Sequence, residues 1–209
     1  MNTTCPNKIQ RSLDWCEGTP EYAGIKRRIF YIAKSFIAKW PTLAKDTDGR
    51  ITAAKYVGSF VLAADASWKH IDVLSDKCQV TSEAQGEGNS QTQLNKLVAV
   101  HPSVGEEASS AALFINNSDN VFLVEDMNGR FRVIGSDRWM TKSTVTQDMG
   151  QGAAGSASTT INAEASDVAP APFYDGQIVT ENGTINEDEE EENPGDNNPG
   201  GNNPGGDED

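Results

Sequence analysis

Ten residues in the last third of the chain alternate strictly between polar and mostly small side chains, and this period of two constrains the fold more than any other feature. The alternating positions are Ser156, Ser158, Thr160, Asn162 and Glu164 against Ala157, Thr159, Ile161, Ala163 and Ala165. Every second side chain of a strand points to the same face, so the pattern predicts a β-strand with one polar face. At about 3.3 Å per residue this strand is roughly 33 Å long, which is long for a small domain. Its other face carries little bulk, so we expect a sheet that neighbouring subunits complete.

Several other segments are predicted to be strands. The clearest signal is a hairpin, in which residues 121–124 and 131–134 flank Asn128-Gly129, a pair that tolerates the positive φ of a tight turn. Residues 24–40 combine helical spacing with a β-rich run, and we expect a strand to about Ile32 followed by a short turn or helix. The remaining predicted strands are residues 56–64, 68–80 and 94–101.

One helix is predicted after Pro102. Ser103 lies three residues before Glu106, which is the spacing of a capping box, and two acidic residues suit the positive end of the helix dipole. Ala108, Ala111, Ala112 and Ile115 form one stripe, and Asn116-Asn117 ends the pattern. The chain therefore reads as mainly β with one short helix.

Both ends differ in composition from the body. Residues 187–209 hold ten acidic residues, no basic ones and repeated Asn-Pro-Gly, without a large apolar side chain. Such a segment buries too little apolar surface to offset the entropy of ordering it. We therefore expect an N-terminal arm over residues 1–20, a β-rich domain over 21–180 and a disordered acidic tail over 181–209.

Charge argues against tight binding of nucleic acid. The whole chain has a net charge of −14, and without the tail it still has 21 acidic residues against 17 basic ones. A surface that holds phosphates is usually basic. The run Lys26-Arg27-Arg28 is therefore interpreted as a solvated face of the domain.

No catalytic, cofactor or metal motif is found, so we expect no enzyme activity, no cofactor and no metal. His70 and His101 are the only histidines that could act as a base, and the chain has no Gly-x-Ser-x-Gly elbow. The glycines of residues 150–155 resemble a dinucleotide loop, but no helix is predicted after them. Three cysteines form no CxxC pair, and no apolar run has the ~20 residues of a membrane span. We expect synthesis and assembly in a reducing cytoplasm, without a membrane partner.

The order of these elements resembles structural proteins of tailed bacteriophages and prophages, most nearly the tail tube subunit (major tail protein). The resemblance covers roughly residues 20–180 and is one of pattern and element order. The stretches that carry it are residues 81–87, 94–96, 122–124, 129–135 and 169–176, together with the Ala-rich helix and the two long Ser/Thr-rich strands.

The resemblance implies a β-sandwich or half-open β-barrel with one flanking helix. It also implies homo-oligomeric rings of six, stacked into a tube in the virion tail, assembled in the bacterial host with other tail proteins. The genome would pass through this tube, so DNA is a passing cargo. The polar residues Ser156, Ser158, Thr160, Asn162 and Glu164 are then the candidate lumen-facing residues. The rival interpretation is a β-sandwich binding module, such as a fibre, a capsid decoration protein or a domain that binds carbohydrate or protein.

Overall fold

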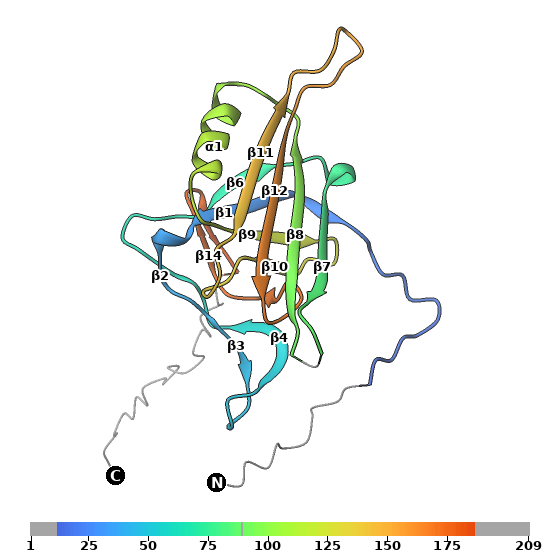
Figure 1. The fold of residues 1–209 in the computed structure, drawn as a ribbon, viewed down its shortest axis with the longest axis vertical. Coiled ribbons are helices and arrows are strands. Elements are labelled where there is room, and N and C mark those ends of the chain that lie inside the picture. Colours follow the sequence, from blue (N-terminus) through green and yellow to red (C-terminus); the bar gives the residue numbers. More distant parts are fainter. Residues whose placement is uncertain (1–11, 89, 187–209) are drawn as a thin grey trace, which may run out of the picture.

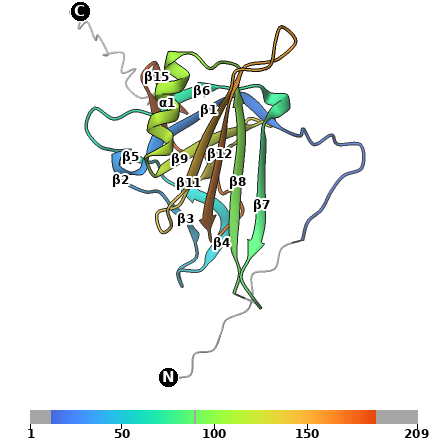
Figure 2. The same cartoon turned by 45° about the horizontal axis from the view of Figure 1, so that its top comes forward.

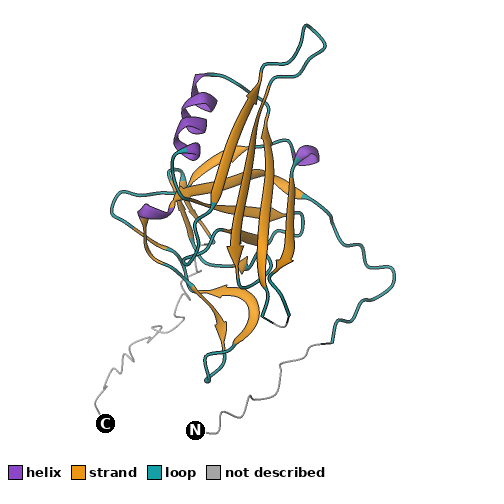
Figure 3. Ribbon diagram, viewed as in Figure 1, coloured by secondary structure: helices purple, strands orange, loops and turns teal. Residues whose placement is uncertain are grey.

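The structure is a computed structural model that describes residues 12–88 and 90–186. It is mainly β, with α1 (Glu106–Asn116) as the one α-helix of the described residues, so the predicted fold class is confirmed (Figures 1 and 3). Residues 12–20 contain no helix or strand and are exposed. The expected arm before residue 12 and the acidic run from residue 187 lie outside the described residues.

A seven-stranded sheet forms the middle of the molecule, in the order β3-β4-β13-β10-β9-β1-β6. Its strands are β1 (Ile25–Ala33), β3 (Thr42–Lys45), β4 (Ile51–Val57), β6 (Lys69–Asp72), β9 (Asn120–Asp126), β10 (Phe131–Ile134) and β13 (Phe173–Tyr174). The predicted hairpin is β9–β10, in which Phe131 pairs with Glu125 and Ile134 with Phe122. The predicted end of the first strand near Ile32 is also confirmed, because the 3-10 turn η1 (Lys34–Phe36) follows β1.

A four-stranded antiparallel sheet covers one face of this middle layer, in the order β11-β12-β8-β7. Its strands are β7 (Gln79–Gln85), β8 (Thr92–His101), β11 (Lys142–Asp148) and β12 (Ser158–Asp167). These strands cross those of the middle sheet steeply, and the β11–β12 connection projects beyond them (Figures 1 and 2). The two sheets therefore pack as an orthogonal sandwich, with α1 beside β11.

Two hydrophobic cores lie on opposite faces of the middle sheet, because alternate residues of its central strands point in opposite directions. Ile29 of β1 and Phe122 of β9 belong to the core between the two sheets. Phe30 and Leu123 belong to the second core, which contains the buried Trp68. The central strands thus have continuous apolar runs, while β12 alternates.

Small elements close the second core. β14 (Ile178–Thr180) pairs with β15 (Gly183–Ile185), and β2 (Ile37–Lys39) pairs with β5 (Val61–Leu62). Ile185 packs against the second core. The expected start of a disordered tail at residue 181 is therefore wrong, because the hairpin continues the ordered domain through Asn186.

Three further boundaries differ from the predictions. Residues 56–64 are not one strand, because β4 ends at Val57 before Gly58, whose φ is +85°. Residues 68–80 are divided between β6 and β7 by the 3-10 turn η2 (Ser75–Lys77). The helix begins after Gly105, and no side chain caps it, so the predicted capping role of Ser103 is wrong. The Ser103 hydroxyl instead accepts from the Gly105 N–H at 3.2 Å.

Candidate functional site: the four-stranded sheet

The outer face of the four-stranded sheet carries the side chains that the sequence singled out. β12 pairs with β11 through Thr160–Thr146 and with β8 through Thr160–Val100, which fixes the face of each residue. Ile161, Ala163 and Ala165 point into the core. Ser158, Thr160, Asn162 and Glu164 therefore share the outer face, as predicted. Ser156 does not belong to the strand, because β12 begins at Ser158 and Ser156 is exposed in the β11–β12 connection.

The same register assigns the outer-face residues of the other three strands. They are Lys142, Thr144, Thr146 and Asp148 of β11, Leu94, Lys96, Val98 and Val100 of β8, and Gln79, Thr81, Glu83 and Gln85 of β7. Hydroxyl and amide groups predominate. The outer face carries two lysines and three carboxylates, so it is weakly acidic overall. One of these lysines, Lys96, donates to Glu83 at 2.8 Å.

The inner face of this sheet carries small side chains, and the facing sheet supplies the large side chains that fill the core between them. Ala99 and Ala163 are fully buried opposite large side chains of the middle sheet, such as Phe122 and Tyr31. One buried amide, Asn95, accepts from the Ala171 N–H at 2.8 Å and donates to the Ala169 carbonyl at 3.1 Å. The small side chains on the inner face of β12 thus allow the two sheets to approach each other closely.

Both edges of this sheet lack a strand neighbour among the described residues. The edge strands β7 and β11 are each seven residues long and contain neither proline nor glycine. Natural proteins usually protect such edges, since their unpaired N–H and C=O groups invite pairing with another chain. The β11 edge is partly covered, because Asn116 of α1 bonds to the backbone of Val145.

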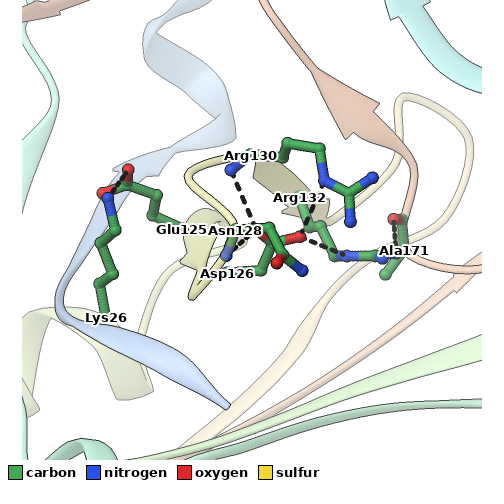
Figure 4. Close-up of polar contacts among 7 residues, drawn as sticks. All are labelled: Lys26, Glu125, Asp126, Asn128, Arg130, Arg132 and Ala171. Carbon is green, nitrogen blue, oxygen red and sulfur yellow. Dashed lines mark hydrogen bonds and ion pairs between the residues drawn. The ribbon is translucent and has the colours of Figure 1, made fainter. Parts of the chain in front are cut away.

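A groove of about 580 Å³ runs beside the β7 edge, between Val80 of β7, Tyr22 of the N-terminal segment and the β9–β10 hairpin. Figure 4 shows the polar cluster at this hairpin, centred on the Asp126 carboxylate. This carboxylate accepts from the Arg130 N–H at 2.9 Å and lies 3.8 Å from the Arg132 Nε. Burial lowers the pKa of Arg132, whose guanidinium also lies 4.0 Å from the Phe173 ring. These contacts hold the hairpin to β13.

The Lys26-Arg27-Arg28 run lies where β1 is irregular, and two of its cations are paired. Lys26 donates to Glu125, as Figure 4 shows, and Arg28 donates to Asp72 at 2.7 Å. This hydrogen bond lowers the pKa of the Asp72 carboxyl group. Pairing with carboxylates reduces the positive charge available to a phosphate, in line with the interpretation of a solvated face.

The two histidines unexpectedly line the same cavity, of about 250 Å³, beneath α1. His101 lies at the end of β8 with its Nδ1 2.7 Å from the Asp72 carbonyl oxygen. The hydroxyl that lines this cavity belongs to Thr159, and it donates to the Ser103 carbonyl at 2.6 Å. That hydroxyl is therefore engaged in a backbone contact. No local sequence signal could have indicated this meeting, because the histidines are brought together by strands of different sheets.

The tryptophans do not form a platform for a sugar ring. Trp68 is buried, and Phe60 packs edge-on between it and Trp40 at ring distances of 5.4 Å and 5.2 Å. Trp15 and Trp139 are exposed on separate segments. The aromatic residues of the second core therefore have a packing role.

Within residues 12–88 and 90–186, no group of three or more His, Cys, Asp and Glu side chains is placed to hold a metal ion. The same residues include no helix with the length and apolar character needed to cross a membrane. Comparison with known proteins finds no matching family model, no matching curated protein and no matching solved structure.

Proposed function

We propose that this chain is a structural virion subunit that self-assembles into stacked rings, as in the tail tube of the tailed bacteriophages that it resembles. The observation that carries the proposal is the four-stranded sheet, with its polar outer face and its two long edges. A sheet whose two edge strands have no strand neighbour among the described residues is a natural unit for building a larger barrel from several copies.

The strand directions suit such a ring. All neighbours within the sheet are antiparallel, and the number of strands is even, so β7 runs opposite to β11. The β7 edge of one copy can therefore pair antiparallel with the β11 edge of the next, in the same way at every junction. This head-to-tail contact is heterologous, which is the type of contact that closes a ring.

The polar face suits a water-filled channel. Six copies of this sheet would make a barrel of roughly 24 strands; with strands ~4.8 Å apart and tilted about 40°, the barrel would be about 50 Å across between backbones. This width leaves room for a DNA duplex inside the side chains. A weakly acidic lining would let DNA pass without holding its phosphates. DNA is then a cargo, and the other partners are further tail proteins of the virion.

The proposal is tested by following assembly of the purified chain as its concentration rises, with electron microscopy and sedimentation velocity. We expect rings or tubes of uniform width. A chain that stays monomeric at high concentration would contradict the proposal. If a glycan or receptor then bound at the groove beside β7, the binding-module alternative would replace it, since this groove is the described feature that favours that alternative.

A substitution pair tests whether the β7 edge takes part. Ala84 of β7 and Ala38 of β2 are both exposed alanines in strands. A lysine on an edge strand opposes strand pairing, because its charge would have to be desolvated. We expect Ala84→Lys to raise the concentration needed for assembly at least tenfold with an unchanged far-UV circular dichroism spectrum, while Ala38→Lys assembles normally. Equal behaviour of the two variants would exclude the β7 edge.

A further inference from the structure

The side chain of Asn116, the last residue of α1, occupies the free edge of β11. Its Oδ1 accepts from the Val145 N–H at 2.7 Å, and its Nδ2 lies 3.4 Å from the Val145 carbonyl oxygen. One amide thus bonds to both backbone groups of a single residue, which is what a residue of a neighbouring strand does. Asn116 therefore takes the place of a strand partner at the middle of this seven-residue edge.

The helix contacts β11 at a second residue of the strand. In an antiparallel strand, the N–H and C=O of alternate residues point to the same side, so Ser143 and Gln147 share the free side with Val145. The Ser109 hydroxyl donates to the Gln147 side-chain oxygen at 3.2 Å. This second contact joins two side chains, so α1 occupies the backbone edge at Val145 and is also tied to the strand at Gln147.

We infer that α1 is a removable cap on the β11 edge, and that the β7 strand of a second copy replaces it during assembly. The inference rests on the proposed function, because a closed ring needs both edges of every sheet. A neighbouring β7 and the Asn116 side chain compete for the same N–H and C=O of Val145. A subunit whose cap is in place can offer β7 to a neighbour but cannot accept one at β11.

The helix has the features of an element that moves at modest cost. Only Ala112 and Ile115 are buried, while Leu113 and Phe114 are exposed, at 70% and 43%. The incoming β7 strand matches β11 in length and runs antiparallel to it. A capped edge makes free subunits slow to join each other, so growth is expected to show a lag and to start faster from preformed rings.

A reversible lock tests the inference. In a chain with Cys5, Cys16 and Cys78 replaced by serine, Ser109→Cys and Gln147→Cys place a thiol on α1 and another on β11. A short thiol-reactive crosslinker with a reducible disulfide centre then ties the helix to the strand. We expect the locked subunit to remain unassembled and to form tubes once a reductant cleaves the crosslinker. Equal assembly before and after cleavage overturns the cap while leaving the proposed function intact; no assembly after cleavage overturns both.

A matched pair of variants weakens the cap instead. Asn116→Ala removes both bonds to Val145. Asn117→Ala is the control, because the side chain of Asn117 donates to the Leu113 carbonyl of the preceding helix and not to β11. We expect Asn116→Ala to shorten the lag and to lower the concentration for half-assembly about fivefold, the factor that the shorter of the two hydrogen bonds contributes. Faster hydrogen exchange at the Val145 amide of the unassembled variant is expected in parallel. An unchanged lag together with unchanged exchange overturns the inference.

Discussion

Asp167 ends β12 with its carboxyl group buried at the junction of the two sheets. It is 4% exposed, its Oδ1 accepts from the Val168 N–H at 2.6 Å, and Tyr56 of β4 donates to its Oδ2 at 3.4 Å. Burial raises the pKa of Asp167 to about 6, and the hydrogen bonds offset only part of this effect. Burial likewise raises the pKa of the Tyr56 hydroxyl. The pair therefore joins the sheets through a carboxyl group whose ionised form is disfavoured by burial.

The raised pKa predicts a pH-dependent stability. Between the ordinary pKa of 3.8 and about 6 the folded chain holds the proton more tightly than the unfolded chain, so the stabilisation is complete below this window and is lost as the pH rises through it. The loss amounts to roughly 3 kcal/mol at ~1.4 kcal/mol per pH unit.

We expect Asp167→Asn to raise the free energy of unfolding at pH 7.5 by up to this amount and to change it little at pH 4. Urea unfolding at both values measures the difference, and the exposed Asp14→Asn is the control. A gain of the same size at both pH values would contradict the prediction.

Side-chain alternation was the residue-level property that could be predicted. The outward direction of Thr160 and the inward direction of Ile161 follow from the period of two, which any strand obeys. The buried setting of Asp167 could not be predicted, because it depends on Tyr56, which is 111 residues away in the chain. The shared cavity of His70 and His101 likewise depends on how the sheets cross.

Among the elements, those fixed by local chemistry were predicted best. The β9–β10 hairpin is set by Asp126, which accepts from the Asn128 and Arg130 N–H groups, and by Gly129 at a φ of +82°. The helix follows from its apolar stripe. The break between β6 and β7 was missed, because β6 pairs with β1 and β7 with β8, so the boundary is set by which sheet each segment joins.

The β14–β15 hairpin leads to a prediction about truncation. Ending the chain after Thr180 removes β15, the contact of Ile185 with the second core and the ion pair between Lys69 and Glu181. We expect the free energy of unfolding to fall by about 1–3 kcal/mol, mainly from lost apolar burial. Ending the chain after Asn186 keeps these contacts and should leave stability within about 0.5 kcal/mol. Thermal unfolding of both truncated chains tests this, and equal stability of the two would show that β15 adds nothing.

At the scale of the whole molecule, the class of fold was predictable but the pairing of strands was not. A β-rich chain with one helix has many possible sheets, and long-range pairings such as β12 with β8 carry no local signal. The parallel contact between β13 and β4 joins Tyr174 to Tyr56 and is of this kind. What the sequence did indicate was a sheet with one polar face. The structure assigns that face to the side of the four-stranded sheet that points away from both cores.

If that face lines a channel, a cation placed on it should act differently from a cation elsewhere. Ser158→Lys and Thr160→Lys each add one positive charge per subunit to the outer face of β12. In an assembled tube these charges form rings that attract phosphates. We expect tubes of normal width that co-sediment with short DNA duplexes at low salt and release them as the salt concentration rises, while the unassembled variants bind DNA weakly.

The control is Asn182→Lys, in the β14–β15 turn on the opposite side of the middle sheet, which adds the same charge away from the channel. DNA retention that is equal in the Thr160→Lys and Asn182→Lys tubes would show that the outer face of β12 does not line the lumen.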